Sequence, residues 1–508
     1  HEEDTIAHFA RLNMHYHLWP LVQGKVAVDS VYLDRPGVFL RQKPDSTWNL
    51  EDLFPQDEQD KKQDSTEPRN FEFTVGLFKI SRGNIRTKTL LPFIPTEINE
   101  LQMALSLNLS EKEQHLLLKD FSFSSRNPDI QINKLKFDVG RDHQNIELRN
   151  FHFETAINQL TGTAHFDSIP PGNGSASFKT EALNMEEFDI FLPHLRIPAN
   201  PVVMIDAGLT RDSASVIIEM NDSHQNIFLD ARSPNLTRFL FNPSEEKLHY
   251  RLKGNFQNVH LSHWIDLPET NHILHGELEI KGKGLAPDGA ELQLSGDFNE
   301  SVIQGIAAEN IHFNYQFVDG DLEGVIKGKG NFGQFHIESG IQNLMNHPVY
   351  RAEIKTRDLD LAPLTGDTTL KSGIWMTATL EGKEFSPEKI SSAVRISLSE
   401  SHFYSIQVDN LLASLDFEEE TFTIDSFRVQ TASANLTAEG IYSFNSPSDL
   451  KIMGHFKDLR EFRDFLPLEG LKTSGEINAR IQGRPDDLAI QSILRVNKSR
   501  FKDYALQR

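Results

Sequence analysis

The sequence contains no cysteine among its 508 residues. Disulfide bonds, thiolate nucleophiles and zinc sites built on thiolates are therefore excluded. No stretch approaches the roughly 18–20 apolar residues of a membrane-spanning helix, and the sequence opens without a secretory signal peptide. Because it begins abruptly and stops inside what reads as a further strand, we expect a trimmed part of a longer protein.

Cations and polar aromatic residues are also scarce. There are 51 Lys and Arg against 73 Asp and Glu, which gives a net charge of −22. Phosphate binding needs a basic surface, so nucleic acid is not an expected partner. The 35 Phe far outnumber the 8 Tyr and 4 Trp. Phe has no polar group to hydrate, which predicts a dry apolar surface, either a closed core or a groove for acyl chains.

Apolar and polar residues alternate along most of the chain, which indicates strands with one dry and one wet face. In residues 129–155 a two-residue step at Asn133–Lys134 interrupts the alternation and predicts a bulge. Lys134, Lys136 and Asp138 should lie on the wet face. The residues predicted to line the apolar face, and with it a lipid groove, are Ile130, Ile132, Leu135, Phe137, Leu148, Phe151, Phe153, Leu278 and Ile280.

Long internal similarity suggests a repeat. Three segments share a Leu, a Gly, an alternating strand, a second Gly and a Pro, and their first glycines (Gly276, Gly373 and Gly475) lie about 100 residues apart. Helix signals at Asn184–Pro193, His260–Pro268 and Asp458–Pro467 precede strands, whereas DLDLAPLTG replaces the helix before the Gly373 copy.

These patterns predict an all-β fold. We expect an elongated, half-open U-shaped sheet of stacked strands with a few short helices, and about 35–40 strands at their usual spacing. The predicted divisions are an N-terminal β segment at 1–54, a charged mobile linker at 55–70, the first part of a β-groove at 71–273, repeat units at 274–369 and 370–470, and the start of a further repeat at 471–508.

Catalytic and metal-binding patterns are missing. His15 and His17 lie two residues apart and would share a strand face, but no third ligand stands near them in the sequence. No nucleophile–base set and no phosphate loop can be nominated. We therefore predict that the protein is not an enzyme and takes no cofactor.

The segment VYLDRPGVFLRQKPDSTWNLEDLF resembles the opening signature of the AsmA/TamB family, with Pro36, Trp48, Asn49 and Leu53 at its structural positions. One departure is Ser46–Thr47, where the family commonly has a Gly in the turn. The later Gly-strand-Gly-Pro segments are similar to the body repeats of the same family.

The resemblance implies a bridge-like lipid transfer protein of the periplasm, anchored in the inner membrane by an N-terminal helix that is not in this chain. It implies a groove that carries phospholipid from the inner to the outer membrane. Its partners would be phospholipid acyl chains, both membranes and, for the assembly role, an outer-membrane barrel protein of the TamA/BamA type.

Two alternatives stay open. The groove or its edge strands could hold unfolded outer-membrane proteins during their insertion. The chain could instead be a closed structural β-solenoid whose Phe residues fill an ordinary core.

Overall fold

The computed structural model is nearly all β, with 73% of the chain in strands and 6% in helices. The predicted all-β class with few short helices is confirmed, and the sheet is open, so the closed solenoid is wrong. The structure describes residues 6–22, 25–43, 47–49, 72–89, 91, 94–111, 113–167, 172–188, 197–243, 246–265, 271–286, 289–386, 389–458, 471–484, 487–501 and 504–506. The predicted linker at 55–70 lies outside these residues.

The chain divides into two compact units. Unit 1 comprises residues 1–246 and 260–269, and unit 2 comprises residues 247–259 and 270–508. The predicted divisions at 71, 274, 370 and 471 stay predictions.

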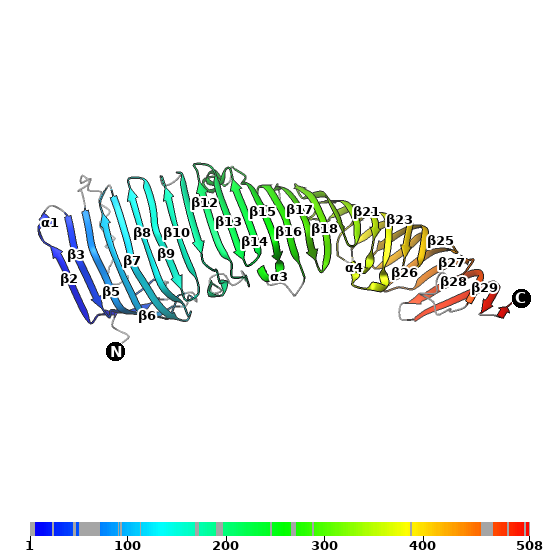
Figure 1. Ribbon diagram of the computed structural model, residues 1–508, viewed down its shortest axis with the longest axis horizontal. Helices are drawn as coiled ribbons and strands as arrows, with labels where there is room; N and C mark the ends of the chain where they lie inside the picture. The colour runs from blue at the N-terminus through cyan, green and yellow to red at the C-terminus, as the bar shows by residue number, and fades with distance from the viewer. Residues whose placement is uncertain are drawn as a thin grey trace. The chain divides into compact units, whose positions relative to one another are not determined.

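Unit 1 is an open sheet with four short helices among its described residues (Figure 1). Its elements are β1 (Ala7–His8), β2 (Arg11–His17), α1 (Trp19–Val22), β3 (Lys25–Asp34), β4 (Gly37–Arg41), β5 (Glu72–Lys88), β6 (Glu97–Leu109), β7 (Glu113–Arg126), β8 (Gln131–Asp142), β9 (Asn145–Thr155), β10 (Gln159–Phe166), β11 (Gly174–Thr180), η3 (Met185–Phe188), β12 (Val202–Leu209), β13 (Ala214–Asp222), β14 (Gln225–Ser233), α2 (Leu236–Phe241) and α3 (Leu261–Trp264).

From β5 to β14 each strand of unit 1 pairs with the next in antiparallel fashion. The long strand β5 also pairs in parallel with β3 and, further along, with β4. β2 is then added antiparallel to β3, and β1 antiparallel to β4. Strands that are adjacent in the sequence are thus neighbours in most of the sheet, which suits turns of only a few polar residues.

Unit 2, taken by itself, is also an open sheet of antiparallel strands. Its elements are β15 (His249–His260), β16 (Ile273–Lys283), β17 (Glu291–Ile303), β18 (Ile306–Val318), β19 (Asp321–Gly330), β20 (Gly333–Gln342), β21 (Val349–Leu359), α4 (Leu361–Thr365), η4 (Thr368–Leu370), β22 (Ser372–Lys383), β23 (Ser391–Phe403), β24 (Ile406–Glu418), β25 (Thr421–Thr431), β26 (Ala434–Ser443), β27 (Ser448–Phe456), β28 (Leu471–Arg484), β29 (Asp487–Phe501) and β30 (Tyr504–Leu506).

Two sets of six strands in unit 2 correspond one to one. Each strand from β16 to β21 begins about 100 residues before its counterpart from β22 to β27. The pairing is antiparallel throughout both sets. The spacing of Gly276 and Gly373 in the sequence reflects this six-strand unit.

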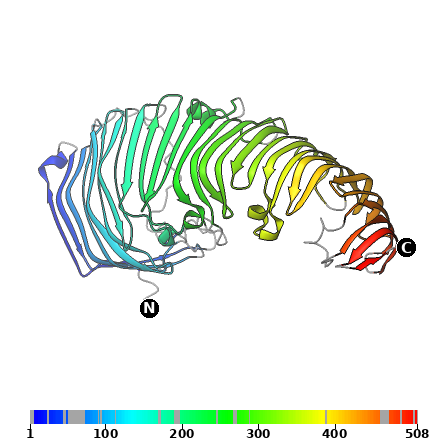
Figure 2. The same cartoon turned by 45° about the vertical axis from the view of Figure 1, so that its right-hand side comes forward.

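The strands curve along their length (Figure 2). In unit 2, buried serines lie opposite bulges in the strands. The register between β22 and β23 shifts between Gly373 and Met376. Opposite this bulge, Ser401 is fully buried, and its Oγ accepts the backbone N–H of Trp375 at 3.0 Å. Ser301 makes the same contact with the backbone N–H of His275, also at 3.0 Å, at the matching bulge of the preceding set. A side chain thus takes the place of a lost ladder bond at each bulge.

The short helices only partly follow the sequence patterns. α3 lies within the segment predicted at His260–Pro268, and the Asn184–Pro193 segment contains η3, with residues 189–196 outside the described chain. The third signal, at 458–467, lies outside it except for Asp458. The expectation that DLDLAPLTG replaces a helix is wrong, because α4 forms there. The Asp360 side chain caps it by accepting the N–H of Ala362, and Gly366 ends it with a φ of 72°.

The signature residues stabilise the turn after β4. Asn49 accepts the backbone N–H of Arg41 at 3.0 Å and donates to the carbonyl of Phe39 at 2.9 Å. Trp48 forms an isolated bridge with Gln42. The carbonyl of Pro36 accepts the N–H of Asn84, which holds the start of β4 against β5 at 2.8 Å. Leu53 lies outside the described residues.

Candidate functional site

One face of the unit 1 sheet is apolar, and its register can be followed from strand to strand. Residues directly opposite each other in an antiparallel pair share a face. Leu135 is opposite Phe153, and Phe153 is opposite Leu160. A longer row of paired residues contains Val139, Leu148, Ala164, Ala176, Ala207, Val216 and Ala231. This surface is called the apolar face of unit 1.

Six of the seven residues predicted on β8 and β9 belong to this face. Ile132 and Phe137 are opposite Phe123 and Leu118 of β7, and Phe151 is opposite Gly162 of β10. Leu135, Leu148 and Phe153 complete the set, and all six are half-buried. Ile130 precedes the first residue of β8 and belongs to the turn. Whether these residues line a lipid groove stays a prediction.

Bulges keep these residues on one face although their spacing is irregular. The register shifts between Ile132 and Lys134, at the step that the sequence indicated, and Asn133 donates to the carbonyl of Thr155 at 2.7 Å. A second irregularity, at Asn150 with a φ of 52°, brings Leu148 and Phe151 to the same side. Without an extra residue in each strand, half of the set would point to the wet face.

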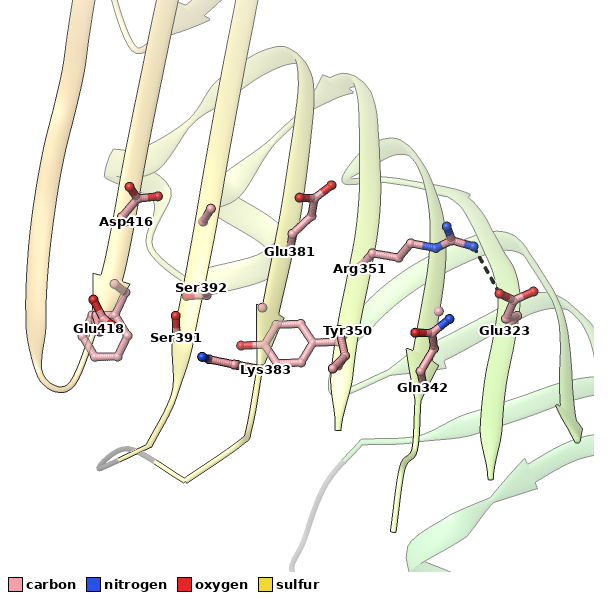
Figure 3. A pocket seen from close by; sticks show the side chains of 15 residues that line it. Glu323, Gln342, Tyr350, Arg351, Glu381, Lys383, Ser391, Ser392, Asp416 and Glu418 are labelled. Carbon is pink, nitrogen blue, oxygen red and sulfur yellow. Dashed lines mark hydrogen bonds and ion pairs between the residues drawn. The ribbon is translucent and has the colours of Figure 1, made fainter. Parts of the chain in front are cut away.

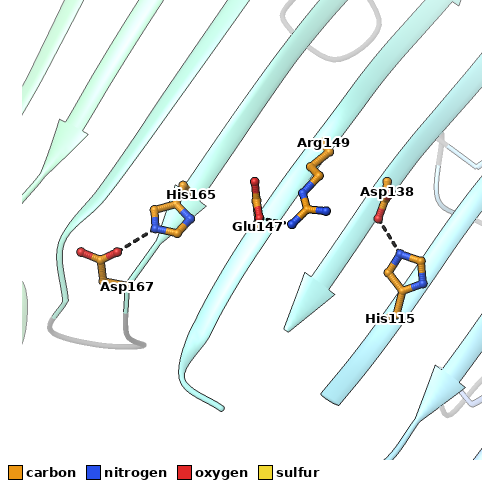
Figure 4. A network of polar contacts seen from close by, with 6 residues as sticks. All are labelled: His115, Asp138, Glu147, Arg149, His165 and Asp167. Atoms are coloured by element: carbon orange, nitrogen blue, oxygen red, sulfur yellow. Dashed lines mark hydrogen bonds and ion pairs between the residues drawn. The ribbon is translucent and has the colours of Figure 1, made fainter. Parts of the chain in front are cut away.

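The other face of unit 1 carries paired polar and charged side chains (Figure 4). His115 contacts Asp138 at 2.7 Å, and His165 contacts Asp167 at the same distance. Between them Arg149 donates to Glu147, and this hydrogen bond lowers the pKa of the Glu147 carboxyl. Lys136, opposite His152, lies on the same face, as predicted. We call this surface the polar face.

In unit 2 the apolar face is continuous over the strands from β16 to β28. Its three central rows, in order of pairing, are Ile280, Leu294, Tyr315, Gly324, Ser339, Ala352, Leu380, Val394, Leu415, Ile424, Gly440, Leu450 and Ile481; Leu278, Gly296, Phe313, Ile326, Ile337, Ile354, Ala378, Ile396, Ala413, Phe427, Ala438, Ile452 and Ala479; and Gly276, Phe298, Ile311, Gly328, Phe335, Thr356, Met376, Leu398, Leu411, Val429, Leu436, Gly454 and Ile477.

None of the residues in these three rows is charged. The predicted residues Leu278 and Ile280 are in the first two rows, and both are half-buried. The neighbouring rows, on the polar face, hold residues such as Glu277, Lys327 and Lys355. The separation of charge between the two faces is therefore complete over the paired residues from β16 to β28.

No second layer of described residues covers this face. Only a minority of its larger side chains are buried, among them Leu398 at 6% exposure. On β29, Ile490 is 68% and Leu494 is 56% exposed. A large, contiguous apolar surface that is left uncovered is typical of a binding surface.

Near one end of its strands the apolar face of unit 2 contains a recess of about 490 Å³. The side chains of Val429, Leu436, Ile477 and Leu494 surround it, with Gly454 between two of them in the paired row. A Cβ at Gly454 would lie 2.7 Å from Cγ2 of Ile477. The remaining lining residues are Phe403, Ile406, Val408, Thr431, Ala434, Asn435, His455 and Phe456. The alternation of apolar and polar residues in the sequence gives no sign of this hollow, because the hollow depends on side-chain volumes and not on polarity.

A second hollow, of about 590 Å³, has a different character (Figure 3). It lies mainly on the polar face, where Arg351 donates to Glu323 at 3.1 Å beside Glu381 and Asp416. Burial, followed by the charge and hydrogen bond of Asp425, raises the pKa of the Asp416 carboxyl. A charged lining of this kind disfavours hydrocarbon, so this hollow belongs to the solvated side of the sheet.

Metal binding at His15 and His17 gains no support. The register shifts between His15 and Tyr16, His15 contacts the Ser30 hydroxyl at 3.2 Å, and His17 pairs with Asp29 at 3.0 Å. Across the described ranges no three His, Asp or Glu side chains are grouped to hold a metal ion. Within the same ranges no helix is long and apolar enough to cross a membrane.

Comparisons with known proteins give no match, whether with family models, with curated proteins or with solved structures.

Proposed function

We propose that this protein carries phospholipid, with the acyl chains on the apolar face and the headgroup in water beside the open sheet. The observation that supports the proposal best is the absence of charge from the three paired rows between β16 and β28. A closed core would explain apolar rows equally well, but this face is uncovered in the described residues. A surface of this kind needs an apolar occupant.

The energetics favour a hydrocarbon occupant that can slide. Each CH₂ group removed from water contributes about 0.8 kcal/mol, whichever row it touches. A charged headgroup would lose several kcal/mol on entering the same surface, so it stays at the rim. Because the three rows stay uncharged from one strand to the next, movement of a lipid along them meets no charged side chain and needs no specific catalytic group.

The cellular setting belongs to the same proposal and rests on the resemblance to the AsmA/TamB family. In that setting the chain is part of a periplasmic bridge, anchored in the inner membrane by a helix outside this sequence, and it passes phospholipid to the outer membrane. The signature residues Asn49 and Pro36 make the turn contacts expected of a structural motif, which is compatible with the resemblance.

A second candidate function is a scaffold for outer-membrane proteins, with a barrel protein as partner. One observation favours it. Among the described strands β2 pairs only with β3, and all seven of its residues are exposed. An edge of this kind can accept a client strand by main-chain hydrogen bonding. Crosslinks from β2 to nascent barrel strands, without bound lipid, would favour this function over lipid carriage.

The test is transfer of a fluorescent phosphatidylethanolamine between two vesicle populations. Ile396→Asp places a carboxylate in the middle row of the apolar face, and Ser397→Asp places one on the polar face of the same strand. We expect the first variant to lose most of the transfer and the second to retain it. Equal transfer by both folded variants would contradict the proposal.

A further inference from the structure

The recess near Gly454 has an internal comparison within the same chain. Because the two six-strand sets share one register, each residue around the recess has a counterpart about 100 residues earlier. The pairs Val429–Leu436 and Leu436–Gly454 correspond to Gly328–Phe335 and Phe335–Thr356. The same place in the sheet therefore occurs twice in unit 2.

In the earlier set this place is filled by aromatic rings. The ring of Phe335 lies directly over Gly328, where it occupies the position that a Cβ would take. Phe332 packs beside it, with ring centroids 5.8 Å apart, and is only 4% exposed. In the later set Ser433 stands where Phe332 was, Leu436 replaces Phe335, and Gly454 replaces Thr356. Leu436 and Gly454 line the recess and are smaller than their counterparts, whereas Val429 is larger than Gly328.

The lining also limits what the recess can hold. Most of the lining residues are aliphatic or aromatic, the polar ones are Thr431, Asn435 and His455, and no Asp, Glu, Lys or Arg is among them. A peptide would bring an N–H and a C=O with every residue, and each unpaired group would cost free energy on burial. A hydrocarbon chain brings no such groups. The recess has a volume of about 490 Å³, which lies within the usual range for small-molecule sites.

We propose that the recess is a resting site for one acyl chain, at which a lipid moving along the apolar face dwells. This inference rests on the proposed function, but it adds a defined site to the apolar face. The acyl chain lies across Gly454, between Leu436 and Ile477, where it gains contacts on more sides than an open sheet face gives. In the earlier six-strand set the ring of Phe335 lies at this place, over Gly328.

The probe is a palmitate analogue with a diazirine near its methyl end, photocrosslinked to the whole chain and mapped by mass spectrometry. In the native protein we expect crosslinks to concentrate on residues 429–436 and 477–494. The triple variant Val429→Gly, Ser433→Phe and Leu436→Phe copies the earlier set, and it should reduce these crosslinks at least tenfold. The reciprocal variant, Phe335→Leu, should raise crosslinking near residues 326–337.

Circular dichroism spectra and urea unfolding show whether each variant is folded. Gly454→Ala, which adds one methyl group 2.7 Å from Cγ2 of Ile477, is a second variant that should weaken the same crosslinks. Crosslinks spread evenly over both sets, and unchanged in the folded variants, would overturn the resting site but leave lipid carriage intact. No crosslinks anywhere on the apolar face would contradict both proposals.

Discussion

Phe137→Asp distinguishes an open apolar face from a closed core. Phe137 is half-buried on β8, opposite Leu118, with the apolar residues of β9 on its other side. Removing the ring forfeits most of the roughly 1.5–3 kcal/mol that a buried Phe contributes. On an open face the carboxylate reaches water, so we expect a loss of about 2–3 kcal/mol in the free energy of unfolding and a protein that still folds.

In a closed core the same carboxylate would be buried without a partner. The loss would then exceed about 4–5 kcal/mol. The control is Lys136→Asp on the polar face, opposite His152, which should change stability by less than about 0.5 kcal/mol. Urea unfolding gives the free energies, and native mass spectrometry counts bound phospholipid. We expect Phe137→Asp to fold and to bind less than half the native amount of lipid. Outright unfolding, or native lipid content in the folded variant, would refute the reasoning.

Two further predictions concern stability. Ser401→Ala removes a fully buried hydroxyl that accepts the backbone N–H of Trp375, so it should cost about 1–3 kcal/mol in urea unfolding, as should Ser301→Ala at the matching bulge, whereas exposed Ser399→Ala should be neutral. A large effect at Ser399 and none at Ser401 would contradict the bulge account. For Asp416, the raised pKa means that the folded state prefers the protonated carboxyl. The contribution of Asp416 to the free energy of unfolding is therefore present at low pH and is lost as the pH rises through the raised pKa. Asp425→Asn should therefore raise the melting temperature more at pH 7 than at pH 3.5, and an equal gain at both values would contradict the coupling.

The fold class could be read from the sequence because alternation reports directly on sheet faces. Ile132, Leu135 and Phe137 were placed together correctly, since a bulge at Asn133 leaves a visible irregularity in the pattern. The number of strands could not be read in the same way. The structure has thirty strands in its described residues, fewer than the 35–40 expected, because strands such as β5, with 17 residues, run through bulges that look like turns in the sequence.

The helix α4 was missed because its signals are local. A side chain of Asp360 and a left-handed Gly366 suffice to form one turn, although its apolar residues have no helical period. The recess was missed for another reason. Leu436 and Gly454 keep the apolar pattern of Phe335 and Thr356 closely enough that only the register, which pairs residues far apart in the sequence, reveals the missing volume.

The central claim is that hydrocarbon occupies the apolar face. It is tested most directly by an electron cryomicroscopy map of the protein purified without detergent, with mass spectrometry of the organic extract from the same sample. We predict elongated density along the rows that contain Ile354, Ile396 and Leu436, together with phospholipid in the extract. A bare apolar face with no lipid in the extract, or density there that is continuous with a protein strand, would contradict the claim.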